Sequence, residues 1–94
     1  MPRDVYIWDD DSYAALAAAA IDWLDVQYVL YHSRPCVRGH LGAVLRVTAP
    51  ARDGRPLLVA LIEDAPDRYR VVGARWLDPA ERTAWEQMMK GELP

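Results

Sequence analysis

An uninterrupted apolar run between two turn signals constrains this chain more than any other feature. Residues 57–62 read Leu-Leu-Val-Ala-Leu-Ile, which suits a strand covered on both faces. Asp53-Gly54 before the run and Pro66 after it favour tight reversals of the chain. Strands are expected on either side, at 42–49 and 69–76. The pattern predicts a three-stranded antiparallel meander with residues 57–62 in the middle.

Three helices are expected around this meander. The alanine-rich residues 13–20 predict a short helix, with N-cap candidates at 10–12. Residues 23–31 predict a second helix that is apolar around more than one face, so we expect it to contact another chain or the end of the sheet. Asp78, Pro79 and Glu81 mark the start of the third helix with a capping box. The predicted fold is α+β, with two N-terminal helices, the meander and a C-terminal helix in a single domain, residues 1–94.

Cysteine usage and the N-terminal sequence bear on the compartment. Cys36 is the single cysteine of the chain, so no internal disulfide can form. The first residues do not combine a basic start with a long apolar run, as a signal peptide would. We therefore expect a cytoplasmic protein without a membrane segment.

Charge is unevenly distributed along the chain, although the net charge is only −3. Residues 1–33 contain one arginine and six aspartates, whereas residues 34–75 contain eight arginines and four acids. A basic middle segment between acidic ends predicts a local anion-binding surface. The alternative is that these arginines simply occupy solvent-facing strand positions.

Arginines, rather than metal or nucleophile motifs, are the main candidates for chemistry. No Cys/His set has zinc spacing, and the run Asp9–Asp11 is more typical of a solvated helix start than of a cation site. Arg70 and Arg75 are five residues apart, so on a regular strand they face opposite sides of a sheet. A bulge or twist near Gly73 would bring them to one side. Either arginine could instead be a salt-bridge partner for a covering helix.

Several segments of the chain together resemble one family. They are Ile7-Trp8-Asp9, Val29-Leu30, Arg55-Pro56-Leu57-Leu58-Val59, Arg70-Val71-Val72-Gly73-Ala74-Arg75 and Glu81-Arg82. In these segments the chain resembles the BrnT toxins of bacterial type II toxin–antitoxin systems, which belong with the RelE/ParE-like ribonuclease toxins. The resemblance implies a RelE-like fold, RNA cleavage without a metal or other cofactor, and neutralisation by a cognate antitoxin.

The same resemblance supplies candidate residues for RNA cleavage. Arginine side chains would stabilise the charge that develops on the scissile phosphate. The catalytic candidates are Arg70, Arg75 and Arg82. The RNA-binding candidates are Trp8, as a positioning or stacking residue, Arg38 and Arg46. The general base stays open among His32, His40 and Glu63.

A second hypothesis is a non-catalytic protein-binding module on the same scaffold. The family usually has Lys-His-Gly between its first two helices, where residues 19–22 of this chain read Ala-Ala-Ile-Asp. Family toxins tend to be basic, whereas this chain is acidic, and RNA binding depends largely on phosphate contacts. A protein partner, or a second copy in a homo-oligomer, would instead contact aromatic anchors. The candidate anchors are Trp23, Tyr28 and Tyr31, with Trp76 and Trp85.

Overall fold

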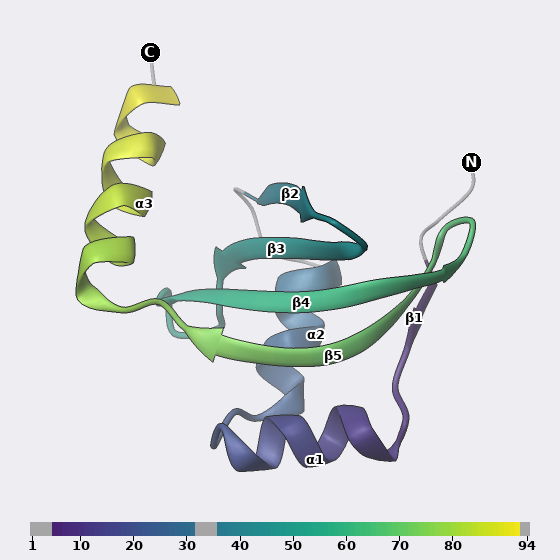
Figure 1. Ribbon diagram of the computed structural model, residues 1–94. Coiled ribbons are helices and arrows are strands. Elements are labelled where there is room, and N and C mark those ends of the chain that lie inside the picture. Colours follow the sequence, from purple (N-terminus) through teal and green to yellow (C-terminus); the bar gives the residue numbers. More distant parts are fainter. Residues whose placement is uncertain (1–4, 32–35, 93–94) are drawn as a thin grey trace.

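A five-stranded sheet and three helices make up the part of the chain that the computed structural model describes, residues 5–31 and 36–92 (Figure 1). In chain order the elements are β1 (Val5–Ile7), α1 (Asp10–Ala18), α2 (Trp23–Tyr31), β2 (Val37–Leu41), β3 (Val44–Pro50), β4 (Pro56–Ala65), β5 (Arg68–Trp76) and α3 (Pro79–Glu92). The α+β class is therefore confirmed. Within the described residues, no helix is both long enough and apolar enough to cross a membrane.

The strand order in the sheet is β1-β5-β4-β3-β2. Strands β2 to β5 pair in succession as antiparallel neighbours, and β1 lies parallel to β5. The predicted three-stranded antiparallel layout is therefore wrong: the chain begins with a strand before the helix pair, and the sheet has five strands and one parallel pair. Strand β1 was not predicted, and β2 overlaps residues 33–40, which the sequence predicts as a loop or short edge segment; both strands lie at the edges of the sheet. β1 has only three residues, and β2 is polar and mostly exposed, so neither shows the apolar alternation that marks a strand.

Strand β4 is the centre of the sheet, as the apolar run predicts. Its residues Leu57, Leu58, Val59 and Leu61 are all buried. The strand has antiparallel neighbours on both sides, and both of its faces are at least partly covered. The central position of residues 57–62 is therefore confirmed.

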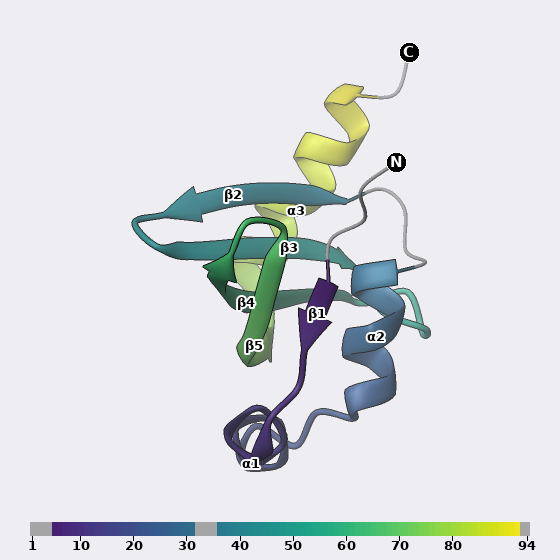
Figure 2. The ribbon, with the colours of Figure 1, turned by 90° about the vertical axis from the view of Figure 1, so that its right-hand side faces the viewer.

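Helices α1 and α2 cover one face of the sheet (Figures 1 and 2). Leu16 of α1 and Val26 and Val29 of α2 are buried in one apolar cluster with alternate residues of β3, β4 and β5. Ser12, which is also buried, donates a hydrogen bond of 2.5 Å from its hydroxyl to the carbonyl oxygen of Val71. The pairing of β1 with β5 ends at Arg70, one residue before Val71. The Ser12 hydroxyl therefore supplies a hydrogen bond to the Val71 carbonyl at the point where β1 no longer pairs with β5.

Helix α1 begins and ends earlier than its alanine content predicts. Asp9 is the N-cap: its carboxylate accepts from the backbone N–H of Ser12 at 2.8 Å, and the Ser12 hydroxyl accepts from the backbone N–H of Asp9 at 3.2 Å. At the other end Ala20 has a φ of 56°, in the left-handed region. The Ala20 N–H donates to Ala17 and the next N–H donates to Leu16, which is a Schellman ending with alanine where glycine is usual.

The other two helices follow the predicted boundaries more closely. Helix α2 spans residues 23–31, as predicted. Helix α3 begins with the predicted capping box: the Asp78 carboxylate accepts from the Glu81 N–H at 2.8 Å, and the Glu81 carboxylate accepts from the Asp78 N–H at 3.0 Å. Helix α3 rises from one end of the sheet, on the side opposite α1 (Figures 1 and 2).

Candidate functional site

A β-bulge in β5 decides which face of the sheet each arginine occupies. Leu61 of β4 pairs with Val71, but Ala60, one residue away, pairs with Gly73, so Val72 is an extra residue in β5. This extra residue shifts the alternation of the strand. Arg70 pairs with Ile62 and Arg75 pairs with Leu58, and both partners lie on the face opposite α1 and α2. The bulge considered from the sequence is therefore present next to Gly73, and both arginines lie on one face.

A third arginine lies on the same face of the sheet. Arg46 of β3 pairs with Ala60, which pairs with Gly73, so these three residues form a row across three strands. A Cβ atom added at Gly73 would have no neighbouring heavy atom within 4 Å, so the surface above this row is open. Ala60 and Gly73 are the small residues of this row. We call the three arginines around them, Arg46, Arg70 and Arg75, the arginine face. Such an arrangement can hold an anion, because guanidinium groups donate in a fork that matches phosphate oxygens.

Arg75 is engaged by the first turn of α3. Its two terminal nitrogens donate to the two carboxylate oxygens of Glu81 at 2.5 and 2.7 Å. These hydrogen bonds, the one from the Asp78 backbone and the charges of Arg75 and Arg46 together lower the pKa of Glu81 to about 2. The same hydrogen bonds raise the pKa of Arg75. Arg75 thus ties α3 to the sheet, yet half of its side chain, 50%, stays exposed.

Arg70 is shared between two carboxylates. It lies 3.7 Å from an oxygen of Asp9, before α1, and 3.5 Å from an oxygen of Asp64, in β4. Hydrogen bonds from the backbone and hydroxyl of Ser12 lower the pKa of Asp9, and the charge of Arg70 lowers it further. The salt-bridge alternative considered from the sequence therefore fits Arg75, whose partner Glu81 is in helix α3, whereas the partners of Arg70 lie before α1 and in β4. An anion on the arginine face has to compete with these carboxylates.

An open cleft of about 250 Å³ lies between α3 and the arginine side of the sheet. Trp85, named above as a candidate anchor, is buried and lines the cleft from α3. Most of the other lining side chains are apolar, and Arg46 and Glu81 supply its charges. The full lining is Val37, Arg46, Thr48, Leu58, Leu77, Glu81, Ala84, Trp85 and Met88. The cleft therefore joins apolar surface to the charged groups of the arginine face.

The remaining predicted RNA and catalytic residues do not gather with these three arginines. Arg82 is exposed in the first turn of α3, beside Glu81. Arg38 pairs with Val47, a residue of the α1 and α2 side, so it lies on the other face of the sheet from Arg46. Trp8 packs against the core on that side as well. The arginine face thus contains two of the three catalytic candidates and one of the three RNA-binding candidates.

The two general-base candidates within the described residues, His40 and Glu63, do not lie on the arginine face. His40 pairs with Leu45 and Glu63 pairs with Tyr69, and both partners belong to the core side of the sheet. His32 lies outside the described residues. Glu81 is the carboxylate next to Arg75, and the sequence analysis assigned it only to the helix cap. Its position six residues after Arg75, at the start of the helix that follows β5, was the signal that could have identified it.

A second candidate site lies on the side of α1 and α2. The ring of Trp8 stacks on Tyr13 with centroids 6.0 Å apart, and it meets Trp23 edge to face at 6.3 Å. Tyr13 and Trp23 are 46% and 41% exposed. We call these three residues the aromatic surface. Of the other predicted anchors, Tyr31 is exposed and contacts Tyr6, and Tyr28 is half-buried.

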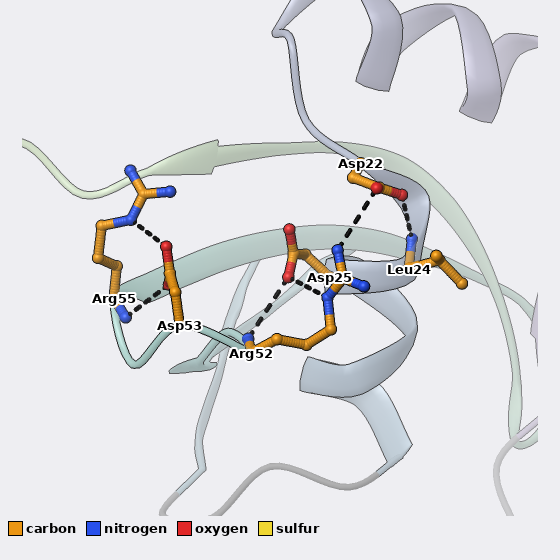
Figure 3. Close-up of polar contacts among 6 residues, drawn as sticks. All are labelled: Asp22, Leu24, Asp25, Arg52, Asp53 and Arg55. Carbon is orange, nitrogen blue, oxygen red and sulfur yellow. Dashed lines mark hydrogen bonds and ion pairs between the residues drawn. The ribbon is translucent and has the colours of Figure 1, made fainter.

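The loop between β3 and β4 fixes the start of α2, and with it Trp23. Figure 3 shows Arg52 reaching from this loop to Asp25, at 2.8 Å, and to Asp22, at 3.4 Å. Asp22 also accepts from the backbone N–H of Leu24 at 2.9 Å. In the same loop Arg55 pairs with Asp53, and its guanidinium carbon lies 4.0 Å from the ring centroid of Trp76. Trp76 is therefore covered within the chain, whereas Trp23 is held in place with its ring partly exposed.

Comparison with known proteins adds no family assignment. No protein-family model matches the chain, and no curated protein has a matching sequence. The arginine face and the aromatic surface, with the resemblance of the short segments, are therefore the features that bear on function.

Proposed function

We propose that this protein is a BrnT-like toxin that cleaves RNA without a metal and is neutralised by a cognate antitoxin. The observation that supports this proposal most directly is the arginine face. Arg70 and Arg75, which bracket the segment most similar to the family, lie on the same open side of the sheet because of the bulge at Val72. Arg46 adds a third positive charge and Glu81 adds a carboxylate.

In this proposal an RNA phosphate binds above Ala60 and Gly73. Arg75 and its neighbours donate to the non-bridging oxygens and stabilise the charge that builds up on phosphorus. The 2′-oxygen of the RNA attacks the phosphorus while the bond to the 5′-oxygen breaks. Glu81 takes the 2′-hydroxyl proton and returns it to the leaving 5′-oxygen.

The ion pair between Arg75 and Glu81 makes the basicity of Glu81 depend on whether RNA is bound. With a pKa of about 2, Glu81 is too weak a base while Arg75 holds it. A phosphate that takes over the guanidinium removes the largest cause of that low pKa. The pKa of Glu81 then rises toward its ordinary range, so the base becomes stronger when RNA is bound.

The test is RNA degradation by the purified protein at low salt, because phosphate contacts weaken as salt rises. We expect cleavage by the wild type, strong loss in Arg75→Ala, and no loss in Lys90→Ala, which removes one exposed positive charge near the far end of α3. Circular dichroism of each variant controls for folding. Absence of cleavage by the folded wild type would exclude the enzyme.

The second candidate function is a non-catalytic protein-binding module. It is favoured by the carboxylates that occupy Arg70 and Arg75 and by the exposed rings of the aromatic surface. This function predicts that the wild type leaves RNA intact under all conditions and still binds a protein through Trp23. The same RNA assay therefore separates the two candidates.

A further inference from the structure

We infer that the aromatic surface binds a protein segment in which arginine or lysine side chains lie beside hydrophobic ones. This inference specifies the partner of the proposed function and rests on the existence of such a partner, but not on RNA cleavage. The occupant is a basic segment of another protein, rather than RNA or a second copy of this chain.

The partly exposed rings of the aromatic surface can bind a cation that lies over them. Trp8 connects β1 to both helices, because it stacks on Tyr13 of α1 and meets Trp23 of α2. Trp8 packs on the core, while the other two rings are partly exposed. A cation over such rings, within about 6 Å of a centroid, is attracted by their π-electrons. The chain itself shows this contact elsewhere, where Arg55 lies over Trp76 at 4.0 Å.

The charge around the aromatic surface selects a positive occupant. Residues 5–31 contain five aspartates and no lysine, arginine or histidine. Asp10 lies one helical turn before Tyr13, and Asp22 directly precedes Trp23. Asp9 pairs with Arg70, and Asp22 and Asp25 pair with Arg52, whereas Asp10 and Asp11 have no ion-pair partner within residues 5–31 and 36–92. The aspartates leave this region with a negative potential that attracts a basic segment.

The same charges disfavour the other occupants. RNA would place phosphates beside the aspartates, and like charges at close range are unfavourable. A second copy packed symmetrically on this surface would bring its own aspartates against these ones. Apolar contact with the partly exposed rings of Tyr13 and Trp23 supplies the rest of the affinity, since aromatic residues are frequent interface anchors.

The experiment uses the full chain and a short synthetic amphipathic peptide with arginines on one helical face and leucines on the other. A matched peptide carries citrulline in place of every arginine, which keeps the shape and removes the charge. Binding is measured by calorimetry at low salt. We expect Trp23→Ala to weaken binding of the arginine peptide about tenfold or more. Asp10→Asn is expected to weaken it by a smaller factor, and the citrulline peptide to bind much less tightly.

Two control variants show whether the effect is local. Leu41→Ala truncates a side chain that is 67% exposed on β2, at the opposite edge of the sheet, and Glu86→Gln removes one exposed negative charge from α3. Neither should change the affinity. Equal binding of the two peptides, equal losses in Trp23→Ala and Leu41→Ala, or no binding of the arginine peptide would each overturn the inference.

The outcomes also separate this inference from the ribonuclease proposal. A Trp23→Ala variant that cleaves RNA normally but has lost the peptide supports both. If the wild type binds the arginine peptide and never cleaves RNA, the result supports the basic partner and excludes the ribonuclease proposal.

Discussion

Replacement of Arg75 by alanine distinguishes a catalytic arginine from a structural one. The side chain donates two hydrogen bonds to Glu81 and is still 50% exposed. Exposed ion pairs contribute little to stability, so the melting temperature should fall by no more than about 5 °C. A charged donor aimed at a reacting phosphate is worth far more, and its loss should reduce the cleavage rate about 100- to 1000-fold. Partial unfolding cannot explain a rate loss of that size if the melting temperature barely changes.

The assay is the initial rate of RNA cleavage at low salt, with circular dichroism melting on the same samples. Glu81→Gln breaks the same ion pair and keeps the arginine, so it is the matched control for stability; its cleavage rate should fall as well, because it removes the proposed base. If Arg75 only ties α3 to the sheet, the two variants lose similar stability and neither changes the rate by more than a few-fold. A rate loss in Arg75→Ala that merely tracks unfolded protein would refute the catalytic assignment.

Three further predictions concern stability. Ala20→Gly should stabilise the protein by about 0.5–1 kcal/mol, measured by urea unfolding, because glycine relieves the strain of the left-handed conformation at a smaller cost in chain entropy. The stability that Glu81 gains from Arg75 should be complete above pH 4.5 and be lost as the pH falls through about 2, so melting temperatures measured across that range should fall less in Glu81→Gln. Ser12→Ala should destabilise by about 1–3 kcal/mol in urea, because it leaves the buried carbonyl of Val71 without its donor.

Features with a local cause could be predicted from the sequence. The central strand β4 follows from an apolar run between two turns. The start of α3 follows from Asp78, Pro79 and Glu81, whose capping contacts span only three residues. Helix α2 follows from its apolar residues.

Features that depend on distant parts of the chain could not be predicted in the same way. β1 is a strand because it pairs with residues 68–70, which lie 63 positions later in the chain. The start of α1 at Asp10 depends on Asp9 and Ser12, and Ser12 is also held by Val71 in β5. For the candidate site, Gly73 showed where a bulge was possible, but the pairing with Ala60 decides that Val72 is the extra residue. Arg38 was grouped with Arg46 because the strand β2 and its pairing were not recognised.

The extra residue in β5 also fixes the side of the sheet from which the chain leaves. Before Val72 the strand alternates in one phase, and after it in the other, so Ala74 and Trp76 pack on the core while Arg75 faces away. Helix α3 starts three residues after Trp76, so the part of β5 that follows the bulge determines where α3 begins. Deletion of Val72 would remove the bulge and leave a regular strand in which Arg70 and Arg75 still face the same side, because the other residues of β5 keep their partners in β4. The bulge is therefore the point at which β5 can lose one residue without exchanging its two faces, whereas a strand of the present length without a bulge would turn Arg75 toward the core.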